Sequence, residues 1–341
     1  MDSLTQIVLG AAVAELVLGK KVGNKAPLWG AICGTIPDLD ILLNPFLSDL
    51  QELGSHRGFS HSICFSILLA PLLGYLLSIF YRKKEANWKE WTMLCFFSLV
   101  THPLLDAFTN YGTQLFLPFS NYRVALNSIF IVDPFYTVPM MFLLIIAMFI
   151  NRKKELRYNF NKVGLIIAHF YLLFTLLNKL YMEMIFENAL KEKSYSFSRY
   201  YTCPLPLQTA LWTCLAEDTN GFHVGYYSWF DKSKDIAFRY FPKNDNGLDE
   251  LKKTFSLKRL SWFTNGYHIF TRKNGELSLN DLRFGKTGGS FNNPGDFIYS
   301  WKISQNKGRT EIDRIEPPFK WDPNVLEELK QRIKGVKKDS L

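Results

Sequence analysis

Long apolar stretches separated by short polar connections fill the first half of the chain. A helix needs roughly 20 apolar residues to cross the hydrocarbon core of a bilayer. Four stretches qualify, and two weaker ones precede them, the first short and containing Glu15, the second interrupted by Gly34, Pro37, Asp38 and Asp40. In chain order the six stretches are 4–18, 26–43, 63–81, 91–108, 129–150 and 163–186. This pattern predicts a membrane α-helical bundle of about six helices over residues 1–187.

The pattern changes after residue 187. Short segments rich in aromatic and β-branched residues alternate with Asn, Gly, Asp and Lys, which is typical of antiparallel strands. Residues 247–256 and 322–335 have the spacing of helices. We therefore expect an extramembrane α+β domain with an antiparallel sheet over residues 188–341. Its many aromatic residues could mark a surface for sugars or lipid headgroups, although packing within a small sheet explains them more simply.

Basic residues are distributed unevenly among the connections. Connections 20–25, 82–89 and 151–162 hold twelve Lys and Arg residues, whereas 44–60 and 110–128 hold two. Short loops rich in Lys and Arg stay in the cytoplasm. We therefore expect a multi-pass membrane protein whose N-terminus and C-terminal domain lie outside. Residues 1–19 lack a basic start and a small-residue cleavage site, so we expect the mature protein to keep them.

Net charge and cysteine content exclude several classes of protein. The net charge of +9 could indicate nucleic-acid binding. Because many of the basic residues flank apolar stretches, we expect no nucleic-acid partner and attribute the charge to membrane topology. The five cysteines show no CxxC spacing, which argues against a zinc knuckle or a disulfide framework. Cys203 and Cys214 both lie in the exported half, where they could pair, but their spacing does not require it.

Carboxylates and imidazoles collect at the membrane face opposite the basic connections. This agreement is independent of the topology, which rests on Lys and Arg alone. Four separate segments contribute, with Asp38 and Asp40, His56 and His61, His102 and Asp106, and Asp133.

Each of these pieces has a simpler explanation when taken alone. Asp38 and Asp40 suit a turn, because Asp hydrogen-bonds its own backbone, and paired histidines in a loop are commonly solvated. His102 and Asp106 are harder to explain in this way. Residues four apart share a helix face, and a charged group costs about 3 kcal/mol in a membrane helix on insertion scales. For this pair the alternative is a hydrogen-bonded clamp between neighbouring helices.

Together, these residues form a ligand set for zinc, manganese or iron. Mixed oxygen and nitrogen ligands are typical of hydrolytic sites, in which the metal lowers the pKa of a bound water. We expect a divalent metal, with zinc as the first choice and manganese or iron as alternatives. The expected ligands are Asp38, Asp40, His56, His61, His102 and Asp106.

Residues beside the expected ligands suggest supporting roles. Arg57 could hold an anionic group such as a phosphate oxygen, and Asp133 could be a further carboxylate at the metal. Ser60 and Ser62 could orient the ligands or cap the next helix, and we expect capping for at least one of them.

The motifs "MDSLTQIVLGAAV", "GTIPDLD", "HRGFSHS" and "THPLLD", in this order, make the chain similar to the YdjM-like family of bacterial inner-membrane proteins, which are described as predicted metal-dependent hydrolases. The resemblance covers roughly residues 1–185. It implies a bacterial inner-membrane protein with a hydrolase-type metal site at the six positions above. Many members have His after Thr in the first motif, where this chain has Gln6 after Thr5. Asp2 or Gln6 must then substitute, or the site has fewer ligands.

The first functional hypothesis is a membrane-embedded metal-dependent hydrolase at the outer membrane face. Membrane lipids are the expected partners, with an ester or phosphodiester of a lipid as the substrate, because a site at that depth meets lipids first. The C-terminal domain would cover the site and help to select the substrate. One alternative is a non-catalytic scaffold or envelope-stress protein with a structural metal or a His–Asp clamp. Another is an ion transporter, since intramembrane Asp and His also mark ion pathways.

Overall fold

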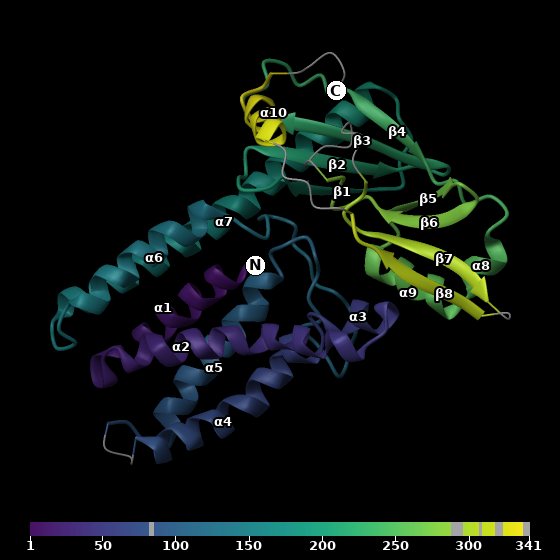
Figure 1. Cartoon of the computed structure of the whole chain (residues 1–341). Helices are drawn as coiled ribbons and strands as arrows, with labels where there is room; N and C mark the ends of the chain where they lie inside the picture. Colours follow the sequence, from purple (N-terminus) through teal and green to yellow (C-terminus); the bar gives the residue numbers. More distant parts are fainter. Residues whose placement is uncertain (82–84, 288–295, 307–308, 318–322, 337–341) are drawn as a thin grey trace. The chain divides into compact units, whose positions relative to one another are not determined.

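The computed structural model describes residues 1–81, 85–287, 296–306, 309–317 and 323–336 (Figure 1). Arg82, Lys83 and Lys84, which count toward the predicted topology, lie outside these residues. Contacts divide the chain into two units. The N-terminal unit comprises Met1–Pro45, Ser55–Asn178 and Pro206–Gln208, and the C-terminal unit comprises Phe46–Gly54, Lys179–Leu205 and Thr209–Leu341.

Helices form at all six predicted apolar stretches. The elements up to residue 192 are α1 (Ser3–Val22), α2 (Lys25–Thr35), the 3₁₀-helix η1 (Ile36–Phe46), α3 (Asp49–Ser55), the 3₁₀-helix η2 (Phe59–His61), α4 (Ile63–Phe80), α5 (Trp88–Asp106), α6 (Pro134–Phe149) and α7 (Glu155–Glu192). The second predicted helix changes from α to 3₁₀ geometry just before Pro37. The boundary predicted after residue 187 falls inside α7.

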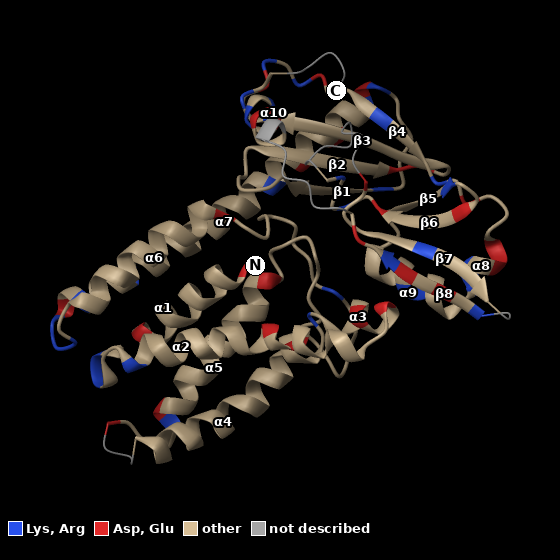
Figure 2. Ribbon diagram, viewed as in Figure 1, with Lys and Arg blue, Asp and Glu red and all other residues tan. Residues whose placement is uncertain are grey.

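Within the described part of the chain, four helical segments are long and apolar enough to cross a membrane: Ser3–Val22, Lys25–Phe46, Ile63–Phe80 and Glu155–Glu192. The apolar helix α6 is shorter, and α5 carries charged side chains near both ends. Figure 2 shows α1–α7 free of charge along most of their lengths. On α4, Leu68, Leu72 and Leu76 follow the i, i+4 spacing of one helix face and are exposed by 64%, 56% and 51%. An exposed leucine stripe of this kind is what a lipid-facing helix presents.

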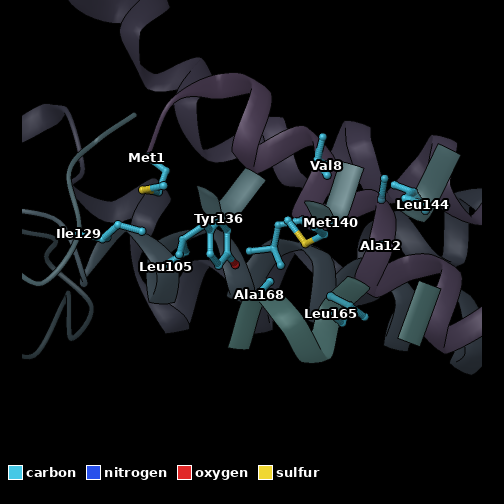
Figure 3. Close-up of a cluster of buried hydrophobic side chains, with 12 residues drawn as sticks. Met1, Val8, Ala12, Leu105, Ile129, Tyr136, Met140, Leu144, Leu165 and Ala168 are labelled. Carbon is cyan, nitrogen blue, oxygen red and sulfur yellow. The ribbon is translucent and has the colours of Figure 1, made fainter. Parts of the chain in front are cut away.

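A core of buried side chains joins α1, α5, α6 and α7. Figure 3 shows Val8 and Ala12 of α1 together with Leu105, Tyr136, Met140, Leu144, Leu165 and Ala168. Each side chain is at most 5% exposed. This core holds the C-terminal end of α5 in place.

Glycines allow α1 and α2 to pack with their backbones almost touching. A Cβ added at Gly10 would lie 2.3 Å from the carbonyl oxygen of Gly30, and one added at Gly34 would lie 2.6 Å from the carbonyl oxygen of Gln6. Membrane helices commonly associate through such small residues, because lipid provides no hydrophobic drive between them. The contact fixes the end of α2 against α1 and α5, where η1 begins.

At the other end of these helices, ion pairs join neighbouring segments of the chain. Lys20 pairs with Glu155, Lys21 with Glu90, and Lys25 with Glu85. Because α1 rises about 30 Å over its length, this end lies far from Gln6. The ion pairs show that three connections meet at one end of the unit: the one after α1, the one before α5 and the one before α7.

A buried ion pair lies one turn further into the helices. Arg157 Nε and Nη2 donate to the two carboxylate oxygens of Glu15 at 2.6 and 2.7 Å, and both side chains are at most 4% exposed. This two-bond pairing ties the start of α7 to α1 and explains how the membrane half tolerates Glu15.

The C-terminal unit contains two antiparallel sheets, where the sequence predicts an antiparallel sheet. The first contains β1 (Arg199–Pro204), β2 (Leu211–Glu217), β3 (Gly221–Ser228) and β4 (Phe238–Pro242). The second contains β5 (His268–Lys273), β6 (Glu276–Asp281), β7 (Ser300–Asn306) and β8 (Arg309–Ile315). In both sheets consecutive strands are neighbours. Three helices lie between or after these strands: α8 (Asp249–Lys253), α9 (Phe255–Thr264) and α10 (Pro323–Ile333).

Both faces of the first sheet are covered. One face packs on the last part of α7, with Trp212, Cys214 and Phe186 in the same cluster. The other packs against the second sheet, with Cys203 and Ile269. Strand register places Cys214 opposite Thr202 and Cys203 opposite Thr213. Since neighbours along a strand point to opposite faces, Cys203 and Cys214 lie on different sides of the sheet, and both are free thiols.

The short helix α3 belongs to the C-terminal unit although its sequence lies between α2 and α4. The Asp49 carboxylate accepts a hydrogen bond from the backbone N–H of Arg314 in β8, and the Arg314 guanidinium lies 3.6 Å from Glu52. The chain therefore passes through the C-terminal unit between residues 46 and 54 and returns to the N-terminal unit at Ser55.

We expect Gly30→Val to destabilise the N-terminal unit. The new side chain would collide with Ala14 and the Gly10 backbone, and overpacking of this kind costs about 1–3 kcal/mol. Thermal unfolding of the full chain in detergent should show a melting temperature lowered by several degrees. Leu28→Val is the control on the same helix, because Leu28 is 54% exposed. Equal melting temperatures for the two variants would contradict the close packing of α1 on α2.

Candidate metal centre

Three elements of the N-terminal unit bring two aspartates and two histidines to one point. Asp38 lies on η1, His61 on η2, and His102 and Asp106 on the last turns of α5. One ligand atom from each of the four lies within 4.8 Å of every other. His61, His102 and Asp106 are at most 1% exposed, whereas the Asp38 side chain is 18% exposed. The cluster is therefore reached from the side of Asp38.

Five of the six distances between the four donor atoms are close to the edges of a metal coordination shell. The Nε2 atoms of His61 and His102 are 3.2 Å apart, and Asp38 Oδ1 lies 3.3 and 3.4 Å from them. Asp106 Oδ2 lies 3.5 and 3.7 Å from the same nitrogens. Ligand bonds of about 2.1 Å give a tetrahedron with edges of about 3.4 Å. The residues present thus fit a small divalent cation.

The hydrogen-bond partners of the two Nδ1 atoms determine whether each Nε2 atom presents a lone pair to the centre. His102 Nδ1 lies 2.5 Å from the carbonyl oxygen of Gly34, which can only accept, so this nitrogen carries the proton. Ser60 Oγ donates to Asp40 Oδ2 and lies 3.0 Å from His61 Nδ1, so it accepts the proton of that nitrogen. Both neutral rings therefore turn an unprotonated Nε2 toward the centre.

With both rings neutral, no proton lies between the four acceptors, so they repel one another, and Arg57 and the Met1 amino group offset the charge of Asp106 alone. A metal ion can bind all four donor atoms, whereas a shared proton can bind fewer of them. Burial alone would lower the pKa of His61, but its hydrogen bonds to Asp38 and Asp40 and the charge of Asp106 outweigh burial and raise this pKa. The same groups that would hold a metal thus also stabilise an imidazolium, which is the basis of the alternative of a His–Asp clamp.

Asp40 and His56 flank the cluster of four. Asp40 Oδ1 lies 3.0 Å from His56 Nδ1, and Asp40 Oδ2 lies 3.3 Å from His61 Nδ1. A carboxylate on the far nitrogen of a metal-binding histidine fixes the ring and raises its basicity. His56 is 26% exposed and lies at the rim. Of the six predicted ligands, four converge, and Asp40 and His56 lie in the layer behind them.

Arg57 is held by contacts on every side. Its Nε lies 3.1 Å from Asp106 Oδ2, its Nη1 donates to Thr109 Oγ1, and its backbone N–H donates to Asp40 Oδ2. Its φ of 55° lies in the left-handed region, which costs a non-glycine residue about 1 kcal/mol or more. Such strain persists where surrounding contacts enforce it. The Arg57 charge is directed at Asp106, and its predicted role of holding an anionic group stays a prediction.

The remaining predicted residues lie outside the cluster. Asp133 caps α6, with Oδ1 accepting from the Phe135 N–H and Oδ2 accepting from the Tyr171 hydroxyl at 2.9 Å each. Asp2 caps α1 by accepting from the Thr5 N–H. Ser62 caps α4 by accepting from the Phe65 N–H, so Ser62 is the capping serine and Ser60 the ligand-orienting one.

Gln6, which follows Thr5 in the first motif, lies beside Asp106. Its amide nitrogen donates to Asp106 Oδ1 at 2.9 Å and to the His102 carbonyl oxygen at 3.3 Å. The amino group of Met1 pairs with the same Asp106 oxygen. Gln6 Oε1 is buried and has no hydrogen-bond partner among the described residues. The amide therefore orients Asp106, and its oxygen stays available next to the centre.

Two contributors to the site carry no sequence signal of their own. The Gly34 carbonyl sets the tautomer of His102, and the Thr109 hydroxyl receives Arg57. A backbone carbonyl can be supplied by any residue, so sequence reasoning has no means of selecting Gly34. Thr109 follows the "THPLLD" motif by three residues, and this spacing from Asp106 was the signal that could have found it.

The profile of a family described as "YdjM inner membrane protein" matches residues 1–182. The chain belongs to the YdjM inner membrane protein family. The match confirms the resemblance based on the motifs, and it supports a membrane location. The match spans α1 to α6 and α7 as far as Met182, and it ends just after the C-terminal unit begins at Lys179.

The chain is also similar to the uncharacterized protein YfhP of Bacillus subtilis (strain 168), with 32% identity over 143 residues. This alignment covers 40% of the chain and 42% of YfhP. The chain thus spans less than half the length of this relative. No solved structure matches the chain at a significant level.

We expect Ser60→Ala to lower the affinity for a divalent metal by about tenfold, because removing a group that orients a ligand typically has this effect. Ser62→Ala is the matched control. Loss of a helix cap costs about 1 kcal/mol, so this variant should melt at a lower temperature and keep its metal affinity. Competition titrations with a chelating dye measure the affinity. An unchanged affinity in Ser60→Ala would show that Ser60 does not support the ligands.

Proposed function

We propose that this protein is a membrane-embedded metal-dependent hydrolase. The single observation that carries the proposal is the convergence of four donor atoms, from His61, His102, Asp38 and Asp106, at distances that suit a metal ion. A divalent metal in such a site lowers the pKa of a bound water and thereby supplies a nucleophile. Membership of a membrane family is consistent with this location.

The number of protein ligands bears on which metal serves catalysis. Four protein donors fill a tetrahedral zinc shell, as in structural sites. A catalytic centre needs a further position for water, so it requires five- or six-fold coordination. Manganese and iron accept such mixed oxygen and nitrogen shells readily, and zinc does so by expansion. The exposed side of Asp38 is where the additional position would lie.

His56 and Asp40 are the groups proposed to move a proton. Asp40 holds His56 through Nδ1, and His56 lies at the exposed rim of the cluster. A histidine oriented by a carboxylate is a common general acid or base. In this proposal His56 Nε2 takes the proton from the attacking water or gives one to the leaving group, and Asp40 keeps the ring in place.

The surroundings of the cluster favour a lipid as substrate. On η1, the residues next to Asp38 and Asp40 are apolar and outward-facing: Leu39, Ile41, Leu42 and Leu43 are exposed by 49%, 51%, 65% and 54%. Phe59 of η2 is 46% exposed. Apolar side chains beside a polar centre suit a molecule with an acyl chain and a polar ester or phosphodiester. We propose that the site and the C-terminal unit lie at the outer face of the bacterial inner membrane, as the basic connections predict.

A structural metal site in a non-catalytic membrane protein is the second candidate. It is favoured by the four protein ligands and by the burial of three of them, because structural sites are closed to water. The two candidates differ in the role of His56. In the structural site His56 contributes nothing beyond its contact with Asp40.

Metal content is the first test. We expect the purified wild type to hold about one zinc, manganese or iron ion per chain by elemental mass spectrometry after reloading, since one such cluster of donors forms among the described residues. His61→Ala and His102→Ala should each lose it, because each removes a donor atom. His223→Ala is the control, since His223 lies in β3 of the C-terminal unit and pairs with Asp218. A wild type without metal after reloading would leave these residues as a hydrogen-bonded clamp.

The second test separates catalysis from a structural role. We expect His56→Gln to keep the metal and to lower the turnover of bis(p-nitrophenyl) phosphate or of a p-nitrophenyl fatty-acid ester by roughly a hundredfold, the size typical of a lost general acid or base. The wild type loaded with each candidate metal provides the reference. Equal turnover in His56→Gln and wild type would argue against the proton-transfer role. No turnover in any metal form of the wild type would favour the structural site.

A further inference from the structure

The long helix α7 fixes the depth of part of the C-terminal unit. Its 38 residues rise about 57 Å, whereas a bilayer core is about 30 Å thick. The helix therefore extends well beyond the hydrocarbon. Its first part belongs to the N-terminal unit up to Asn178, and the rest to the C-terminal unit. The predicted apolar stretch of this helix begins at Val163, and about 20 helical residues cross the core, which places the residues around Met182 at the level of the lipid headgroups.

Exposed apolar side chains gather at that level. On α7, Leu180, Tyr181 and Met184 are exposed by 62%, 41% and 50%. In the turn after β3, Trp229 and Phe230 are exposed by 48% and 62%, and the Trp229 ring contacts the Tyr181 ring edge-on with centroids 6.0 Å apart. We call these five residues the aromatic patch. The ring contact places the turn beside α7 at the depth of Tyr181.

The turn that carries Trp229 and Phe230 is held rigidly in this position. The buried Asp231 carboxylate accepts two hydrogen bonds from Arg332 of α10, at 2.6 and 2.9 Å, and one from the Ser228 N–H at 3.0 Å. The Phe230 N–H donates to Ser228 Oγ. A buried ion pair thus presents two large aromatic side chains outward. Exposed apolar patches that are built in this way usually mark an interaction surface.

Basic side chains follow the patch along the same loop. Lys232 and Lys234 are exposed, and Lys234 Nζ lies 6.0 Å from the centre of the Tyr181 ring. Trp and Tyr are enriched at membrane interfaces, and lysines near anionic headgroups are attracted to them. Aromatic residues with lysines next to them therefore match the order of layers at a bilayer surface.

We propose that the aromatic patch inserts into the headgroup region of the bilayer that α7 crosses, and that it anchors the C-terminal unit to the lipid. The occupant is phospholipid rather than a protein partner, because the depth of the patch is set by a helix that continues out of the membrane. The anchor does not depend on the metal centre, and it would exist equally in a non-catalytic protein.

Fluorescence quenching by brominated lipid tests the anchor. The full chain is reconstituted in vesicles of phosphatidylcholine and phosphatidylglycerol, with or without phosphatidylcholine brominated at carbons 6 and 7. The emission of Trp229 is obtained by subtracting the fluorescence spectrum of Trp229→Phe from that of the wild type. We expect this difference to lose most of its intensity in brominated vesicles and to resist aqueous iodide. Phenylalanine keeps the apolar character of the site, so the variant should fold.

Trp301→Phe provides the matched control, because Trp301 lies in β7 of the same unit and is 1% exposed. Its emission should be insensitive to both quenchers. Quenching of the Trp229 emission by iodide and not by bromine would overturn the anchor and place the patch in water. Protection from both quenchers would overturn it as well, since the patch would then be covered by protein.

Discussion

Hydrogen-bond acceptors that face one another inside an apolar bundle are the constraint on which the site depends. Two carboxylates and two imidazole nitrogens face one centre, and the described cations that pair with them, Arg57 and the Met1 amino group, both lie at Asp106. In surroundings of low polarity such a group of acceptors is unstable without a cation. The metal would therefore act on folding as well as on chemistry, since its ligands come from η1, η2 and α5 and are brought together only in the folded chain.

The packing of the helices supplies the geometry that this centre requires. Glycines let α1 approach α2, so that the Gly34 carbonyl reaches His102 and the Gln6 amide reaches Asp106. The buried pair of Glu15 and Arg157 ties α7 to α1 near the other end. Polar groups thus occupy both ends of the helices, while the middle is filled by apolar and small residues. The positions of the site residues follow from where each helix ends.

The helices and the family could be predicted from the sequence, because length, hydropathy and four motifs carry that information. The convergence of His61, His102, Asp38 and Asp106 was also within reach, since topology alone sends them to one face. The different roles of residues that are close in the sequence could not be predicted. Asp38 and Asp40 lie two residues apart on a 3₁₀-helix, where three residues complete a turn, so their carboxylates point in different directions. Ser60 and Ser62 likewise take separate roles, which depend on a backbone path that no local pattern specifies.

Because most of α3 belongs to the C-terminal unit, that unit cannot be exchanged at a single boundary in the chain. Residues 46–54 belong to the C-terminal unit, yet they lie in the chain between Asp40 and His56. Exchange of the C-terminal unit with that of another protein would therefore require two replacements, one after α7 and one inside the stretch that connects site residues. A recombination event at a single boundary would leave Asp49 and Glu52 without the strand that receives them. The C-terminal unit is therefore built from two separate stretches of the chain, and one of them interrupts the sequence that supplies the site residues.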